Sequence, residues 1–349
     1  MQEPLIFDGH NDLLLRLHQH DVPAGKDGFQ GAGGRHIDLD KAQLGGFGGG
    51  FFAIFVPGEK SLSNDMDEML LSSYDLPLPP QVDWNDASKV ALSQASILIN
   101  LERDGALKIC RNTKEIRECL NSGLMAAVMH MEGAEAIDPD FQTLDVLYEA
   151  GLRSLGPVWS RPTIFAHGVP FRFPNTPDIG SGLTEIGTRL IRKCNDLGVM
   201  IDLSHLNESG FWDVARISTK PLVATHSSAH ALCPHSRNLT DRQLHAIRDS
   251  DGMVGLNFAV AFLRSDGRMI EETPIVTMLD HLDHLIEQLG EDRVGMGSDF
   301  DGAVVPEGIK TIAGLPNLRS AMADRGYNDV LIKKLCHDNW LRVLDLTWT

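Results

Sequence analysis

Short apolar runs alternate with longer segments of helical periodicity along most of this chain of 349 residues. Runs of this kind, bounded by turn residues, are typical of β-strands that alternate with α-helices. Eight can be counted, at about residues 5–10, 49–56, 124–131, 152–158, 199–204, 221–226, 253–258 and 293–298. Eight βα units predict an α/β fold, a closed (β/α)8 barrel of the TIM type, which gathers its chemistry at the carboxyl ends of the strands.

Several of the intervening helices have recognisable ends. Apolar residues recur at helical spacing over residues 83–104, and Thr184 is expected to cap a helix that ends at Gly198. Thr273, which precedes a proline, predicts the start of another helix that ends near Gly290. Two C-terminal helices, expected near residues 316–325 and 328–345, would complete the outer ring.

Three segments do not fit a plain barrel because they are rich in Gly, Pro or Ser: residues 24–34, 57–82 and 160–182. We interpret them as long βα loops over the mouth of the barrel. The glycine-rich stretch 45–50 lacks both the GxGxxG order and a Walker lysine, so it indicates close backbone packing in the second strand rather than a phosphate site.

Composition narrows the range of partners. With 42% hydrophobic residues and no break in composition, the chain is expected to form one barrel domain over residues 1–349. A net charge of −17 argues against nucleic acid and anionic membranes as partners. The N-terminus lacks the features of a secretory signal, and no apolar run approaches the roughly 20 residues of a membrane span, so a cytoplasmic location is expected. Five cysteines without CxxC spacing are interpreted as reduced and mostly buried.

Residues able to bind metal or move a proton stand at the ends of five of the apolar runs. The first run leads into His10-Asn-Asp12, and side chains two apart on a strand project from the same face. Alone, such a pair is more often structural than a metal site. Four later runs end in the same way, at Glu132, His205, His226 and Asp299. Parallel strands would aim all five ends at one place, which predicts a catalytic centre.

The residue types indicate which chemistry this centre performs. His10, Asp12, Glu132, His205 and His226 are more than one tetrahedral zinc ion needs, but they suit two divalent ions bridged by a carboxylate and a hydroxide. The natural division places the first two on one ion, the two later histidines on the other, and the glutamate between them. Ions about 3.5–4 Å apart would lower the pKa of a bridging water toward neutrality, which favours hydrolysis.

Two further residues are candidates for substrate binding and proton transfer. Two dications exceed the charge of two carboxylates and a hydroxide, so the site should attract an anion. Arg237 can hold a carboxylate with both arms of its guanidinium, although a loop-bracing role is the alternative. Asp299 is the expected base that takes the proton of the nucleophile and returns it to a leaving amine, with Asp301 as a weaker rival.

Several segments together resemble the renal (membrane) dipeptidase family, peptidase family M19 of the amidohydrolase superfamily. They are His10-Asn-Asp12, Glu132-Gly133, residues 201–205, 224–226, 236–238 and 297–302, with further similarity at 325–327 and 339–342. The resemblance therefore spans nearly the whole chain. It implies a zinc-dependent (β/α)8 hydrolase with a binuclear centre that cleaves dipeptides, tolerates a D-residue at the C-terminal position, and forms a homo-oligomer, dimeric or larger. It also implies the ligand set given above, with Arg237 on the substrate carboxylate and Asp299 as the proton shuttle.

Two positions depart from this family. Trp159 stands where family members often carry a histidine that polarises the scissile carbonyl, and an indole N–H cannot become cationic. His167, further along the same loop, could fold back into that role or be an ordinary loop residue. After Asn257-Phe258, Ala259 stands where the family often has tyrosine. A changed acyl substrate is therefore an alternative.

Other functions and other residues stay open at this point. One alternative is a hydrolase of N-acyl amino acids or related small amides, and another is a non-catalytic barrel that binds peptides or metal. His130, two residues before Glu132, is either a participant or a residue of the barrel interior. Asp8 and Asp202 either support the ligating imidazoles or are satisfied inside the barrel. Two histidines on the helix after Thr273, His281 and His284, are expected to be surface or packing groups.

Overall fold

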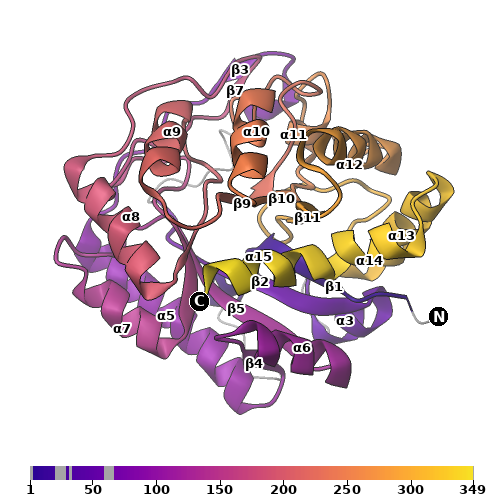
Figure 1. Cartoon of the computed structure of the whole chain (residues 1–349), viewed down its shortest axis with the longest axis horizontal. Coiled ribbons are helices and arrows are strands. Elements are labelled where there is room, and N and C mark those ends of the chain that lie inside the picture. The colour runs from indigo at the N-terminus through magenta and orange to yellow at the C-terminus, as the bar shows by residue number, and fades with distance from the viewer. Residues whose placement is uncertain (1–2, 20–28, 31–33, 59–66, 349) are drawn as a thin grey trace.

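A central barrel of parallel strands organises the molecule (Figure 1). The computed structural model describes residues 3–19, 29–30, 34–58 and 67–348. The barrel strands are β1 (Ile6–Asn11), β2 (Phe47–Phe55), β5 (Met125–Glu132), β6 (Leu152–Gly156), β8 (Met200–Ile201), β9 (Val223–Ser227), β10 (Met253–Leu256) and β11 (Val294–Met296). All eight strands predicted from the sequence are present. Strand β4 (Leu107–Ile109) lies outside this set and pairs in parallel with the start of β5, at residues 125–127.

The barrel closes between its first and last strands in the path. Hydrogen-bonded neighbours run in the order β8-β6-β5-β2-β1-β11-β10-β9, and every pair along it is parallel. The two ends of this path meet at a parallel bridge between Asp202 and Val223, where the Leu203 N–H donates to the Val223 carbonyl at 2.8 Å. Side chains add to this contact, since the Thr225 N–H and hydroxyl both donate to the Asp202 carboxylate. The predicted (β/α)8 architecture is confirmed.

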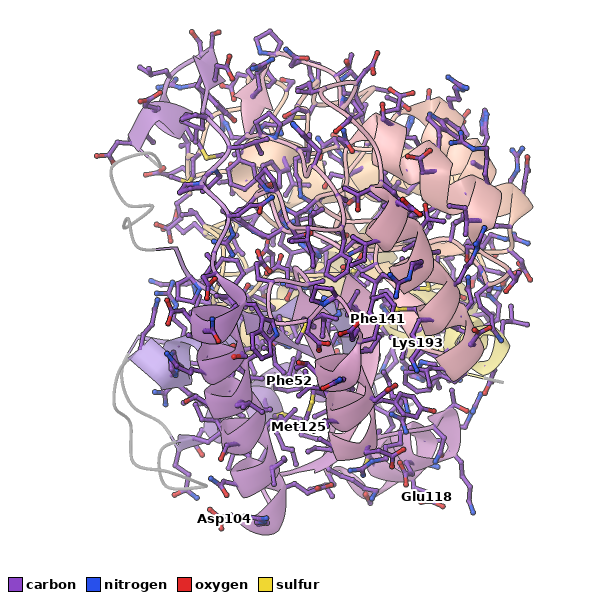
Figure 2. The ribbon with its side chains drawn as sticks, turned by 90° about the vertical axis from the view of Figure 1, so that its left-hand side faces the viewer. Phe52, Asp104, Glu118, Met125, Phe141 and Lys193 are labelled. Carbon is purple, nitrogen blue, oxygen red and sulfur yellow. The ribbon has the colours of Figure 1, made fainter. Side chains whose placement is uncertain are left out.

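Helices surround the barrel and carry the chain back to the start of each strand. They are α1 (Leu13–Gln19), α3 (Leu39–Gly45), α5 (Trp84–Arg103), α6 (Thr113–Ser122), α7 (Gln142–Ala150), α8 (Glu185–Leu197), α9 (Glu208–Ile217), α10 (Asp241–Asp249), α11 (Val260–Leu263), α12 (Ile275–Leu289), α13 (Leu315–Asp324), α14 (Asp329–Lys333) and α15 (Asn339–Thr347). Three single turns, η1 (Asp67–Leu70), η2 (Ile312–Gly314) and η3 (Lys334–Asp338), join them. Figure 2 looks onto this outer layer, with Asp104 at the end of α5 and Glu118 on α6 at one end of the barrel.

The predicted helix ends are mostly correct. The Thr184 hydroxyl accepts a hydrogen bond from the Gly187 N–H, and Gly198 ends α8 in the left-handed conformation at φ 69°. The predicted start of α12 is wrong by one residue: Pro274 is its N-cap, and the Thr273 hydroxyl instead donates to the Ile270 carbonyl at 2.6 Å. Pro274 takes the extended backbone of the N-cap, at φ −64° and ψ 143°, so the first helical residue is Ile275.

The C-terminal helix α15 closes the end of the barrel opposite the strand carboxyl ends. Trp340 is fully buried, and its indole N–H donates to the Met296 carbonyl at 3.0 Å. A side chain at Gly9, Gly255 or Gly295 would collide with this indole, so glycine at these positions makes space for it. The candidate site residues can therefore lie only at the end of the barrel where the strands have their carboxyl ends.

Two of the segments interpreted as plain loops pair with each other. Strand β3 (Tyr74–Asp75), in segment 57–82, lies antiparallel to β7 (Arg172–Phe173), in segment 160–182. This two-stranded sheet could not be predicted from the sequence, because a strand of two residues has no periodic pattern. Most of segment 24–34 lies outside the described residues. Among the described residues, no helix is both long and apolar enough to cross a bilayer.

Candidate active site

The five predicted metal ligands meet at the carboxyl end of the barrel. His10 lies on β1 with Asp12 just beyond it, Glu132 ends β5, His205 follows β8, and His226 lies on β9. Each of these strands is parallel to its neighbours, so residues at their ends reach the same opening. All five residues are buried, with at most 5% of their surface exposed.

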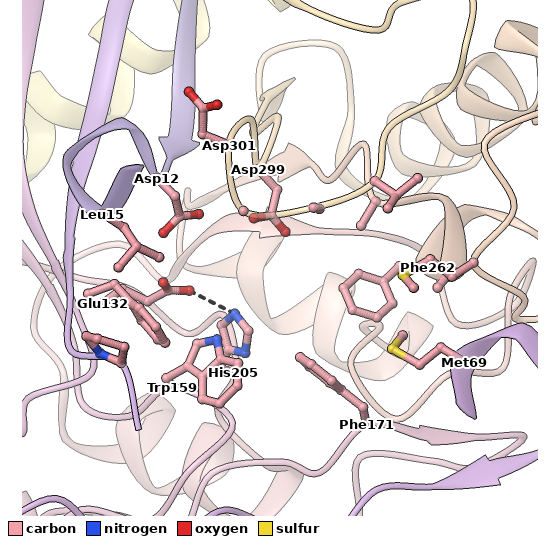
Figure 3. A pocket seen from close by; sticks show the side chains of 18 of the residues that line it. Asp12, Leu15, Met69, Glu132, Trp159, Phe171, His205, Phe262, Asp299 and Asp301 are labelled. Carbon is pink, nitrogen blue, oxygen red and sulfur yellow. Dashed lines mark ion pairs between the residues drawn. The ribbon is translucent and has the colours of Figure 1, made fainter. Parts of the chain in front are cut away.

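Glu132 stands between two groups of ligand atoms. Its Oε2 lies 3.6 Å from His10 Nε2, which is itself 3.5 Å from Asp12 Oδ2. Its Oε1 lies 3.0 Å from His205 Nε2 and 3.5 Å from His226 Nε2. The two carboxylate oxygens thus face different partners, and Figure 3 shows Glu132 directed toward His205. The candidate ligand atoms of His10, Glu132 and His226 also lie within 4.8 Å of one another, so the two pairs form one compact cluster around this carboxylate.

The unpaired nitrogens of this cluster fit a metal centre. Within the described part of the chain, neither ring nitrogen of buried His10 has a hydrogen-bond partner. The Nε2 atoms of His205 and His226 face each other at 3.0 Å, a gap in which only one proton can lie. Buried polar atoms without partners are rare and costly, and cations satisfy several lone pairs at once. The donor set of imidazoles and carboxylates is one that zinc accepts.

The charges of the cluster point the same way. Burial raises the pKa of Glu132 well above its usual value, and it also raises that of Asp299. Burial opposes protonation of His10, but the nearby carboxylates of Glu132 and Asp12 outweigh it and raise its pKa to about 10. Carboxylates gathered in a buried site need positive charge beside them. Divalent cations would supply it.

Two of the histidines have a hydroxyl oxygen within hydrogen-bond distance of Nδ1, and this oxygen can accept the ring proton. Ser160 Oγ lies 2.8 Å from His205 Nδ1, and Thr225 Oγ1 lies 2.8 Å from His226 Nδ1. Since the Thr225 hydroxyl donates to Asp202 at 2.6 Å, its oxygen is free to accept from the imidazole. Each Nδ1 can then keep its proton, which leaves each Nε2 lone pair for a metal.

Asp299 lies at the edge of this cluster. Its ligand atom is within 4.8 Å of those of His10 and Asp12. The Asn257 side-chain amide donates to Asp299 Oδ2 at 3.0 Å, so one oxygen is held while the other faces the cavity side. Asp301 is placed differently, because its carboxylate accepts from the backbone N–H groups of His36 and Ile37. In Figure 3 that carboxylate points away from Asp12, which favours Asp299 as the reacting group.

Arg237 is buried beside the cluster. Its two terminal nitrogens donate to Ser227 Oγ at 2.9 Å and to the His226 carbonyl at 3.0 Å. Burial lowers its pKa to about 10, which the surrounding carboxylates oppose. Its Nε is buried without a partner among the described residues. The guanidinium also lies over the Phe262 ring, 5.9 Å from the centroid.

A cavity of about 520 Å³ opens onto the cluster (Figure 3). Asp12, Glu132, His205 and Asp299 line one end of it. Trp159 forms part of the wall, with its ring 5.8 Å from that of His205. His167, the other candidate on this loop, does not line the cavity; its Nδ1 pairs with the Gly168 carbonyl at 3.1 Å.

Other histidines and aspartates lie beneath the cluster or away from it. His130 is buried, 2.9 Å from the Ser154 hydroxyl and 3.6 Å from the Asp202 carboxylate. Asp8 accepts from the backbone and hydroxyl of Ser298 rather than from a ligating imidazole. Asp202 Oδ2 accepts from the Thr225 hydroxyl, which contacts His226 Nδ1, and lies 4.0 Å from that nitrogen itself. Both packing histidines behave as expected on α12, where His281 pairs with the Leu263 carbonyl and His284 with Asp241.

The model of the membrane dipeptidase family, peptidase family M19, matches residues 1–347. The chain belongs to this family. Its structure matches that of a metallo peptidase from Rhodobacter sphaeroides liganded with a phosphinate mimic of the dipeptide L-Ala-D-Ala, with 54% identity, a TM-score of 0.97, and coverage of 99% of this chain and 100% of the other. A second M19 dipeptidase structure matches with 54% identity and a TM-score of 0.96, over 99% of each chain.

A relative from Klebsiella pneumoniae, described as an uncharacterized protein in the pqqA 5′ region, is 49% identical over 244 residues, or 70% of this chain and 90% of its own length. The resemblance drawn from the sequence motifs is thus confirmed, and as a member of family M19 the protein is a metallo-dipeptidase. The hydroxyls of Ser160 and Thr225 and the amide of Asn257 were not found from sequence. They belong to common residue types, and only their positions beside the ligands give them a role.

Proposed function

We propose that this dipeptidase hydrolyses dipeptides with two zinc ions held by His10, Asp12, Glu132, His205 and His226. The observation that carries the proposal is the position of Glu132, whose Oε2 lies 3.6 Å from His10 Nε2 while its Oε1 lies 3.0 Å and 3.5 Å from the Nε2 atoms of His205 and His226. Bound there, two divalent cations would lower the pKa of a water molecule and polarise the peptide carbonyl.

Asp299 then acts as the proton carrier. One of its oxygens is fixed by Asn257, and the other can take the proton of the attacking water and deliver it to the departing amine. Burial raises the pKa of Asp299, so it holds a proton more readily than an exposed aspartate does. Its position at the edge of the cluster and beside the cavity supports this assignment.

Arg237 binds the carboxylate of the substrate in this proposal. Its charge is buried beside the cluster, and its Nε has no partner among the described residues. Trp159 contributes a wall against which the peptide packs, and its indole N–H can donate one hydrogen bond. His167 lies outside the cavity lining, as Arg237 does, but its Nδ1 pairs with the Gly168 carbonyl on its own loop, and we assign it no contact with the reacting atoms.

The range of substrates includes dipeptides with a D-residue at the C-terminal position. The similar protein from Rhodobacter sphaeroides was crystallised with a mimic of L-Ala-D-Ala, and its chain is 54% identical over the full length. We further propose a cytoplasmic homo-oligomer. All five cysteines are buried as free thiols, as in proteins of reducing compartments.

The decisive experiment is a substrate panel on protein whose metal content has been measured. We expect about two zinc ions per chain, turnover of L-L and L-D dipeptides, and no turnover of the matching N-acetyl compounds. A dipeptidase needs the free α-amino group, whereas a hydrolase of N-acyl amino acids does not. Preference for the N-acetyl series would contradict the proposal.

The variant Asp299→Asn tests the proton carrier. Loss of the carboxylate should reduce kcat by about 10²–10⁴-fold, the usual contribution of a positioned acid or base. Both zinc ions should remain, because the proposed ligand set is untouched. Metal analysis and kcat are measured on the same sample. Zinc loss in step with activity would make Asp299 a ligand instead.

A further inference from the structure

The cavity has two chemically different ends. Away from the ligand cluster its wall consists of Met69, Phe171, Phe262 and Met269, which we call the apolar lobe. Figure 3 shows three of these side chains, Met69, Phe171 and Phe262, grouped across the cavity from Glu132. The total volume of about 520 Å³ lies within the range of about 300–1,000 Å³ typical of pockets for drug-sized ligands. The cavity as a whole therefore has room for more than the backbone of a dipeptide.

Backbone contacts hold the apolar lobe in place. The Met269 N–H donates to the Met69 carbonyl at 2.8 Å, which brings the two thioether residues together from distant parts of the chain. Nearby, the buried Tyr74 hydroxyl donates to the Gly267 carbonyl at 2.6 Å. Met69 and Phe262 belong to one small hydrophobic cluster, and Phe171 and Met269 pack against it. The lobe is thus built by its own core rather than by loose loops.

The apolar lobe lies on the side of the proposed proton carrier and carboxylate site. Segment 299–304 begins at Asp299, and the Val304 carbonyl accepts from the Val260 N–H at 2.9 Å, at the start of α11. Helix α11 carries Phe262, and the guanidinium of Arg237 lies over the Phe262 ring. Asp299 serves the leaving amine and Arg237 the terminal carboxylate. Both groups belong to the C-terminal residue of the substrate.

We propose that the apolar lobe receives the side chain of the C-terminal residue, and that this enzyme prefers dipeptides with a large, flexible apolar residue there, such as leucine, methionine or phenylalanine. This inference rests on the function proposed above. Thioether and aromatic side chains are suited to it, because methionine adapts its shape to a ligand and makes favourable contacts with rings. A short polar side chain would leave the lobe partly filled and gain little from it.

The test compares two series of dipeptides on the zinc-loaded protein. In the first, L-Ala precedes Ala, Leu, Met or Phe of either configuration; in the second, the same residues precede Ala. We expect kcat/KM to rise at least about tenfold from Ala to the best apolar residue in the first series, and to vary less than about threefold in the second. A larger gain in the second series would overturn the proposal.

Two variants locate the effect. Met69→Gln and Met269→Gln keep the length of the side chain but place an amide in the apolar lobe, and each should lower the Leu-to-Ala ratio of the first series at least about fivefold. Leu70→Gln is the matched control, since Leu70 lies on the same turn but is 43% exposed. An unchanged ratio in both methionine variants would overturn the proposal, as would an equal fall in the control.

Calorimetry separates this inference from the proposed function. Phosphinate mimics of Ala-Ala and Ala-Leu should bind the wild-type protein with affinities that differ at least about fivefold in favour of leucine, and Met69→Gln should remove the difference. If no dipeptide were hydrolysed, the proposed function would fail while this binding preference would still support the lobe. Equal affinities in the wild type would overturn the lobe assignment even in an active dipeptidase.

Discussion

The two ends of the cavity are built in different ways. At the ligand end, His10, Glu132 and His226 lie on strands whose positions are fixed by barrel hydrogen bonds. At the lobe end, Met69 and Phe171 lie on segments between strands, held by a small cluster and a few hydrogen bonds. The residues whose chemistry requires accurate placement thus lie on the barrel strands. The residues proposed to select the substrate side chain lie on connecting segments, which can change in sequence without disturbing the barrel.

The largest effect is expected from the removal of one proposed ligand at the ligand end of the cavity. His205→Ala should leave one of the two metal positions empty and lower kcat by at least about 10³-fold, because the second ion supplies several kcal/mol of transition-state stabilisation. The measurements are metal content and kcat. Turnover should be too slow for the Leu-to-Ala ratio of the substrate panel to be determined. His284→Ala, on the outer helix α12, is the control that should retain both metals. Full activity with two metals in His205→Ala would remove this residue from the centre.

A smaller effect is expected from the hydroxyl behind His205. Ser160→Ala removes the partner of Nδ1, so the imidazole loses its fixed orientation and proton position. Zinc affinity should fall about 10–100-fold, the usual effect of losing such a partner. Competition with a chelator measures it.

Ser154→Ala is the matched control, since it removes the hydroxyl that pairs with His130 beneath the cluster. Its zinc affinity should stay within about twofold of the wild type, well below the usual effect on a ligand's partner. An equal loss in both serine variants would bring His130 into the metal centre.

The smallest effect is expected from Tyr74, whose hydrogen bond supports the segments that form the apolar lobe. Tyr74→Phe deletes the buried hydrogen bond to the Gly267 carbonyl and should lower the free energy of unfolding by about 1–2 kcal/mol. Zinc affinity should not change, because the ligand cluster is held by the barrel. Denaturant unfolding and metal competition are compared on the same protein. A fall in zinc affinity would show that the two ends of the cavity are coupled.

The sequence predicted the ligand end far better than the lobe end. Each proposed ligand ends an apolar run, and parallel strands place such ends together, so local patterns were enough to expect His10 and His226 in one cluster. The lobe could not be found in this way. Met69 and Met269 are 200 positions apart, and only the backbone hydrogen bond between them shows that they meet.

Local sequence patterns did not decide which of two residues on the same loop takes a given role. Thr273 looks like a helix cap, but Pro274 takes the N-cap position, and the helix begins one residue later than expected. His167 follows Trp159 on one loop, yet only Trp159 lines the cavity. Which of two nearby polar groups faces a site depends on contacts made by the whole loop.

By itself, the sequence determined the barrel, the order of its strands and the set of side chains at their carboxyl ends, because hydrophobic periodicity fixes strands and parallel strands share an edge. Only the tertiary structure decided how the two oxygens of Glu132 divide between partners, which hydroxyls hold the imidazoles, and which loop residues form the apolar lobe. These features depend on distances between residues remote in the chain, and such distances are set by packing rather than by local pattern.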